Sequence, residues 1–200
     1  MTDTIIMQGP GYTIAQTDVA GTAVPYGPFG HPDSSQNYGF MDLRDHPERA
    51  TAIPEAQSSS GMQAILQAVN APGFRFMSLG CERALFPLAN AKPGEPTWLC
   101  GSYIQVAYRD SALNRNPKRF IALSQRILRD VPSSNEHHIG FEMIVEPLRS
   151  FFGEEGCHAL MVKPLGYGGS EAAALAAWEY AATAVAAVFV QLQSLSPPTQ

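Results

Sequence analysis

The chain has 200 residues, enough for one ordinary domain with a substantial buried core. Hydrophobic residues make up 45% of it and charged residues 16%, against about 25% charged in typical globular chains. We therefore expect a surface that is largely neutral or covered by a partner. The net charge is −5 and the basic residues are scattered, which argues against a nucleic-acid-binding surface, since that needs clustered Lys and Arg.

The chain start and the cysteines indicate a cytoplasmic protein. Residues 1–7 contain neither a basic segment nor a long apolar run, as a secretory signal would. Cys81, Cys100 and Cys157 are an odd number without a Cys-x-x-Cys pair, which is ordinary in a reducing compartment. We predict three free thiols.

Residues 1–60 are predicted to form an irregular arm packed on the rest of the domain. Residues 12–19 could form one short strand, but the repeated Gly and Pro of residues 25–32 exclude a long helix or a central strand. The arm also carries large side chains that disordered segments usually lack, namely Tyr26, Phe29, Tyr38, Phe40 and Met41. Residues 50–60 are interpreted as a polar connector.

From residue 60 onward, helix and strand signals follow one another regularly. A helix is expected over residues 60–69, and a second begins with Asn116 as N-cap and Pro117 in its first turn. The four expected strands cover residues 74–79, 98–108, 139–145 and 157–165.

The last helix is predicted to begin after Ser170 and to end near Ser194. Its apolar residues follow steps of three and four along a seam, namely Leu175, Trp178, Ala182, Val185, Phe189 and Leu192. A second face carries only small residues: Ala174, Ala177, Ala181 and Ala184. The length suits a membrane span, but a central carboxylate, Glu179, is costly in lipid. We therefore expect a soluble helix buried on two sides, one by the sheet and the other by the arm or a second subunit.

Together these elements predict an α+β fold. It comprises an antiparallel sheet of about four strands built from two ββα units, helices mainly on one face, and an irregular N-terminal arm. The predicted division is an arm (1–60), a core domain (61–195) and a tail (196–200).

The glycine-rich turn before the last helix is one candidate site. No nucleotide-binding, zinc-protease, serine-hydrolase or EF-hand motif is present. Helix N-termini attract anions, and glycine allows close approach to the backbone. Gly168, Gly169 and Ser170, with Lys163 upstream, could therefore bind an anionic group. The alternative is an ordinary turn capped by Ser170.

A second candidate lies on the strand over residues 139–145. If side chains alternate there, His138, Glu142 and Glu146 share the face opposite Phe141 and Met143. With His158 on the next strand, His138 and Glu142 could serve acid–base, metal or haem chemistry. The alternative is a solvated face on which Lys163 pairs with Glu142.

Cys81 is a third candidate because a neighbouring cation such as Arg83 lowers a thiol pKa. The alternatives are a buried thiol and an Arg83 neutralised by Glu82.

The leading functional hypothesis is a cytosolic small-molecule-binding protein, expected to be an enzyme that acts on a small anionic or polar metabolite, although the sequence indicates no reaction type. Its pocket would lie between the sheet and the aromatic arm. Ligand-binding residues would be Gly168, Gly169, Ser170 and Lys163, and catalytic ones His138, Glu142 and Cys81. One alternative is an interaction module acting through homo- or hetero-oligomerisation, and another is a metal- or haem-dependent enzyme. A homo-oligomer is expected, without nucleic-acid or membrane partners, and the sequence identifies no cofactor.

Overall fold

The computed structural model describes residues 3–30 and 36–195, so the predicted tail at 196–200 lies outside the described part. The helices are η1 (Pro47–Ala52), α1 (Pro54–Gln57), α2 (Ser60–Val69), α3 (Ser111–Asn114), α4 (Pro117–Asp130) and α5 (Glu171–Ser194). The longer strands are β1 (Thr4–Gly9), β2 (Tyr12–Gln16), β6 (Phe76–Pro87), β7 (Trp98–Tyr108), β8 (His138–Pro147) and β10 (His158–Gly168). The two-residue strands are β3 (Ala23–Val24), β4 (Phe29–Gly30), β5 (Gln36–Asn37) and β9 (Ser150–Phe151).

The prediction of a four-stranded antiparallel sheet is wrong, because the main sheet has six strands in the order β1-β2-β8-β10-β7-β6 and is mixed. Strand β2 runs parallel to β8, with Ile14 beside Met143, whereas the other neighbouring pairs of this sheet are antiparallel. The added hairpin β1–β2 comes from the arm. Its apolar residues 5–7 are consecutive and mostly exposed at the sheet edge, so they lack the alternation by which a strand is usually detected.

The α+β class and the mostly antiparallel pairing are confirmed. The four expected strands correspond to β6, β7, β8 and β10, and the helix caps Asn116 and Ser170 accept backbone N–H groups as predicted. Residues 50–60 are not a connector, since they contain the end of η1, all of α1 and the start of α2.

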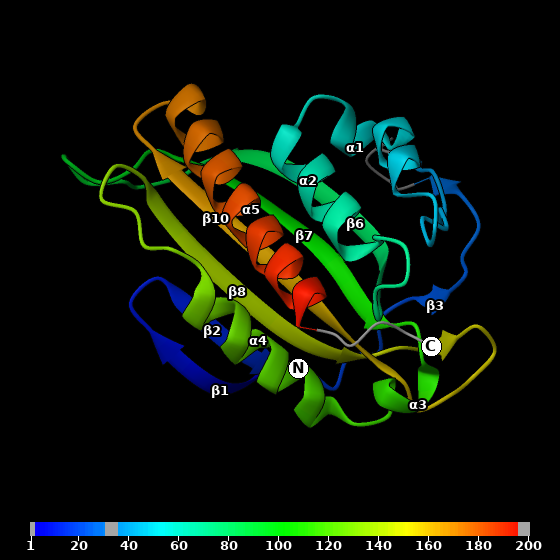
Figure 1. The fold of residues 1–200 in the computed structure, drawn as a ribbon. Helices are drawn as coiled ribbons and strands as arrows, with labels where there is room; N and C mark the ends of the chain where they lie inside the picture. The colour runs from blue at the N-terminus through cyan, green and yellow to red at the C-terminus, as the bar shows by residue number, and fades with distance from the viewer. Residues whose placement is uncertain (1–2, 31–35, 196–200) are drawn as a thin grey trace.

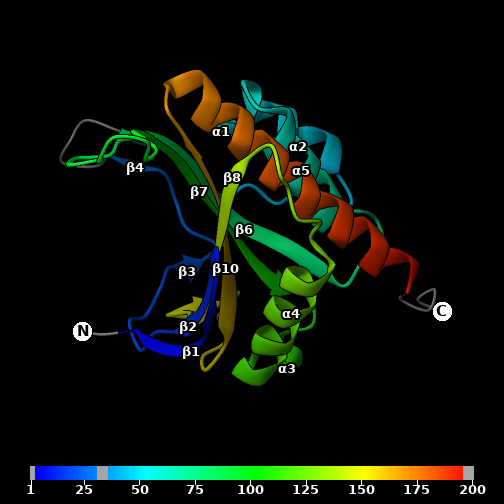
Figure 2. The same ribbon diagram turned by 90° about the vertical axis from the view of Figure 1, so that its left-hand side faces the viewer.

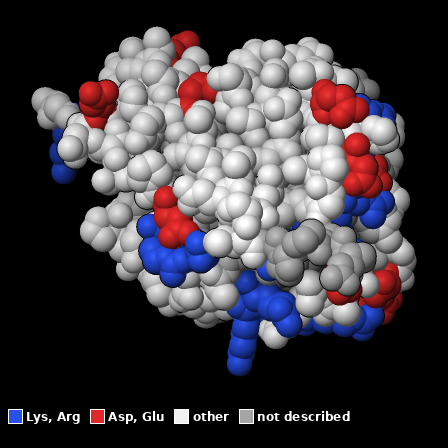
Figure 3. Space-filling model, viewed as in Figure 1, with Lys and Arg blue, Asp and Glu red and all other residues white. Residues whose placement is uncertain are grey.

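Helix α5 is the centre of the helical layer (Figure 1). It packs on β10 and β7 and lies beside α2, and Trp178, Val185 and Phe189 are fully buried. Its second side is therefore covered by α2. By length and a mean hydropathy of 1.6, α5 could also cross a membrane, but 56% of that apolar stretch is buried in the fold. The surface over α5 and α2 carries few charges (Figure 3).

Two glycines of β10 allow α5 to lie directly on the strand. A Cβ atom at Gly166 would stand 2.2 Å from the backbone nitrogen of Trp178, and one at Gly168 would stand 2.4 Å from that of Ala174. Any side chain at either position would push the helix away. These glycines therefore serve helix–sheet packing.

Glu179, in the middle of α5, stabilises the start of α2. Its Oε2 atom accepts the backbone N–H of Gly61 at 2.6 Å and the hydroxyl of Ser60 at 3.1 Å. Its Oε1 atom lies 3.5 Å from the guanidinium of Arg83, which also stacks 5.2 Å from the ring centroid of Trp178. The carboxylate thus satisfies an N-terminal N–H group that has no partner within its own helix.

The sheet face opposite the helices is partly covered by the arm and the β9 region. Figure 2 shows the helices on one side of the sheet and β3 on the other. A second, smaller core fills the covered end, formed by Val24, Met77, Leu79, Ala107, Leu148, Phe151, Cys157 and Ala159. The remainder of this face is open, where Phe86 is 49% exposed.

Candidate functional site

A cavity of about 400 Å³ lies between the arm and β6, the last strand of the sheet. We call it the arm cavity. It is lined by Tyr26, residues 37–42, Arg49, residues 53–55, Leu66 of α2 and residues 78–81 of β6. An apolar cleft with a few converging polar groups is the usual form of a small-molecule site.

Tyr26 forms a wall of the arm cavity and is held there by specific contacts. Its hydroxyl donates to the carbonyl oxygen of Leu79 at 3.2 Å, and its own carbonyl accepts the N–H of Phe40 at 2.9 Å. The two rings also meet edge to face, with centroids 6.3 Å apart. Gly80 leaves room for the Tyr26 hydroxyl, because a Cβ atom at this position would lie 2.8 Å from it.

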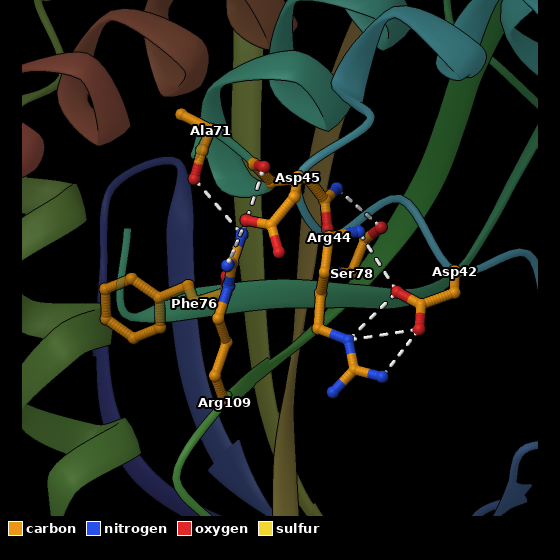
Figure 4. Close-up of polar contacts among 8 residues, drawn as sticks. Asp42, Arg44, Asp45, Ala71, Phe76, Ser78 and Arg109 are labelled. Carbon is orange, nitrogen blue, oxygen red and sulfur yellow. Dashed lines mark hydrogen bonds and ion pairs between the residues drawn. The ribbon is translucent and has the colours of Figure 1, made fainter. Parts of the chain in front are cut away.

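Arg109, just after β7, ties the arm to α2 and β6 (Figure 4). Its Nη1 pairs with Asp45 of the arm at 2.9 Å, and its Nε donates to the carbonyl of Phe76 at 3.0 Å. Its Nη2 donates to the carbonyls of Asn70 and Ala71, each at 3.1 Å. One guanidinium thus fixes three segments around the cavity.

Asp42 lines the cavity but is already neutralised. The Arg44 guanidinium donates to both of its oxygens (Figure 4), and this hydrogen bonding lowers the pKa of Asp42. Arg44 in turn lies 4.8 Å from the ring centroid of Phe152. The pair is therefore part of the fixed wall.

Glu55, Tyr26 and Cys81 converge at the arm cavity. Burial, together with Glu55 and Glu82, raises the pKa of Cys81 to about 12. Burial, followed by the charges of Cys81 and Glu55, raises the pKa of Tyr26. At neutral pH both groups are protonated. The prediction of Cys81 as a nucleophile relied on Arg83. Arg83 pairs with Glu179, and the pKa of Cys81 is raised, not lowered.

A second hollow crosses the open face of the sheet, and we call it the trough. The register places Gly140 opposite Leu165, Leu165 opposite Gly101, and Gly101 opposite Ala84. Residues of this row line two hollows, one with Ala84, Gly101 and Leu165 and the other with Gly140 and Leu165. The trough comprises two hollows of about 320 and 220 Å³ that share part of their lining.

One wall of the trough contains Glu142 and Lys163, which sequence reasoning singled out. They stand opposite each other in β8 and β10, and Nζ of Lys163 donates to the Glu142 carboxylate at 2.5 Å. Tyr103 and Glu82 are paired in the neighbouring strands. Burial, and then Glu82, raises the pKa of Tyr103, so this phenol is a hydrogen-bond donor at neutral pH.

Glu142 and Glu146 lie on the face opposite Phe141 and Met143, as the alternating pattern predicted. Phe141 and Met143 belong to the core under the helices. Glu146 differs from the expected solvated row because it is only 5% exposed. Its carboxylate accepts a hydrogen bond from the Gln105 amide, and burial raises its pKa.

The two predicted histidines are not brought together. His138 stands opposite Tyr167 at one end of the β8–β10 ladder, and His158 stands opposite Pro147 at the other end. Within the described residues, no group of three or more His, Cys, Asp or Glu side chains could hold a metal ion. The proposed set of His138, Glu142 and His158 therefore does not form one site here.

The residues of the predicted anion site are also not brought together, because Lys163 is separated from the glycine-rich turn. Ser170 accepts the N–H of Ala173 on its hydroxyl at 3.2 Å and that of Ala174 on its carbonyl at 3.0 Å. Lys163 lies in the wall of the trough, on the opposite face of the sheet from α5. Gly168, Gly169 and Ser170 thus form a capped strand-to-helix turn without Lys163.

Comparisons with known proteins found no family model, no curated protein and no solved structure that matches this chain.

Sequence reasoning missed Glu55 and Arg49 as cavity residues. Both lie in segments where no chemical motif is present, and only the fold places them beside β6. The aromatic residues of the arm were the one available signal, because they indicated a segment packed against the domain.

Proposed function

We propose that this protein binds a small molecule in the arm cavity. The observation that supports the proposal is the cavity itself: about 400 Å³ between the arm and β6, within the size range of about 300–1,000 Å³ typical of ligand pockets. Its walls are held by the hydrogen bonds of Tyr26 and Arg109, so little ordering entropy is lost when a ligand enters.

The lining indicates a ligand with an apolar body and polar ends. Ile53, Leu66 and Leu79 supply apolar surface, whereas Glu55 and Arg49 supply charge of both signs. The protonated Cys81 is a contact rather than a nucleophile in this proposal. We therefore propose binding as the core function and attach no reaction to the site.

A fragment screen tests the proposal with a matched pair of variants. Ile53→Trp places a large side chain in the cavity wall, and Ala52→Trp adds the same side chain at the adjacent exposed position, which does not line the cavity. Fragments that bind the natural protein by titration calorimetry should lose affinity for Ile53→Trp and keep it for Ala52→Trp. A screen without binders, or equal binding to both variants, would refute the proposal.

The exposed strand β1 favours a second candidate function, assembly with another copy of the chain. Ile5, Ile6 and Met7 are 58%, 43% and 38% exposed, and no charged residue occurs in Thr4–Gly9. Uncharged edge strands readily pair with other strands. Native mass measurement should then show a dimer, and Ile6→Lys should convert it to a monomer; a monomer at all concentrations of the natural protein would exclude this function.

A further inference from the structure

We propose that the ligand of the arm cavity carries a protonated amine, which lies beside Glu55 and among the aromatic side chains of the arm. This inference rests on the proposed function, since it names the chemical class of the ligand in the same cavity.

Among the described residues, Glu55 is the acidic side chain of the cavity lining without a counterion. Its side chain is half-buried in α1, and among the described side chains no cation lies within ion-pair distance of it. The other acid of the lining, Asp42, is paired with Arg44. A partly desolvated carboxylate without a partner is unfavourable, and a ligand ammonium would relieve that cost through charge-assisted hydrogen bonds.

Glu55 belongs to the same part of the lining as two other titratable side chains. It lines the cavity together with Tyr26 and Cys81. The basic residue of the lining, Arg49, is exposed on η1. Water and salt therefore screen the charge of Arg49 more than that of the half-buried Glu55.

Three aromatic residues belong to the same lining. Tyr26, Tyr38 and Phe40 line the cavity, and the Tyr38 side chain, 58% exposed, stands at its mouth. Cations bind favourably over the faces of such rings. A carboxylate beside several aromatic residues is thus the combination that selects an amine over a neutral group of the same shape.

Two probes of matched shape test this inference. Phenethylamine and 2-phenylethanol share one carbon skeleton but differ in charge at neutral pH. By titration calorimetry, phenethylamine should bind the natural protein about tenfold or more tightly than 2-phenylethanol, the effect expected of a charge-assisted hydrogen bond. Glu55→Gln, which keeps the shape of the side chain, should abolish the difference. Glu48 is an exposed acidic residue of η1 outside the lining, so the control Glu48→Gln should preserve the difference in affinity between the two probes.

The outcomes distinguish this inference from the proposed function. If both probes bind equally and Ile53→Trp blocks them, the cavity binds small molecules and the amine inference is wrong. The inference also fails if Glu55→Gln retains the preference for the amine. Absence of phenethylamine binding at millimolar concentrations would overturn it as well, whatever other fragments bind.

Discussion

Replacing Glu179 by alanine should destabilise the fold more than its half-exposed position suggests. The change removes the acceptor for the Gly61 N–H, which lies 2.6 Å away at the start of α2. Loss of such a helix-capping acceptor costs about 1 kcal/mol. It also removes the negative charge that faces the positive end of α2 and the guanidinium of Arg83, worth about 1–2 kcal/mol in a partly buried setting. The expected loss is about 2–3 kcal/mol in the free energy of unfolding.

Glu179→Gln separates the two contributions. The amide oxygen of Gln can still accept the Gly61 N–H, but the charge is gone, so this variant should lose about 1–2 kcal/mol. Urea denaturation measures both losses, and Glu136→Ala, at an exposed loop position, serves as control with a change within about 0.5 kcal/mol. The reasoning fails if Glu179→Ala is as stable as the control, or if the Gln and Ala variants lose the same amount.

Three further predictions follow from buried groups. Phe189→Ala should lower the free energy of unfolding, measured by urea denaturation, by about 3–5 kcal/mol because Phe189 is fully buried. The control Val190→Ala, at a neighbouring side chain that is 54% exposed, should change it little. An unmoved melting temperature for Phe189→Ala would contradict this prediction. Because burial raises the pKa of Cys81 to about 12, iodoacetamide at pH 8 should modify it slowly in the native protein and rapidly after unfolding, as mass spectrometry would detect. Burial also raises the pKa of Glu146, so ionisation of this carboxyl opposes folding when the pH is above its ordinary pKa. Glu146→Gln should therefore raise the melting temperature at pH 7 and lose that advantage below about pH 4. A difference in melting temperature that stays constant from pH 7 to pH 4 would refute the sign of this effect.

The part of the fold predicted from sequence is the part with strong periodicity. Helix α5 carries apolar residues at steps of three and four, and α4 begins with a recognisable N-cap and proline, so both could be found without coordinates. Strand β2 falls within the short strand expected over residues 12–19, but its partner β1 could not be found, because it is largely exposed and shows no inward-facing pattern. The position of this hairpin depends on a long-range parallel contact with β8, to which local sequence gives no clue.

The candidate site was predicted only in outline. Aromatic residues in a segment rich in Gly and Pro indicated an arm over the sheet, and the arm cavity lies at such a place. The chemistry was assigned elsewhere, because Gly166 and Gly168 serve helix packing and His138 and His158 are separated by the full length of the hairpin. The burial of side chains and the register of the strands decide which residues share a site, and the spacing of residues along the sequence reveals neither.

The arm cavity and the exposed strand β1 lie at the two opposite edges of the same sheet. At β6, side chains occupy the outer edge: Tyr26 donates to the carbonyl of Leu79, Arg109 donates to that of Phe76, and Asn70 accepts the N–H of Ser78 at 3.0 Å. No further strand can pair with residues 76–79 of β6 without displacing these side chains. At β1, no described side chain hydrogen-bonds to the backbone, and the apolar residues face solvent. Strand addition by another chain is therefore expected at β1, whereas the covered start of β6 borders a cavity suited to a small molecule.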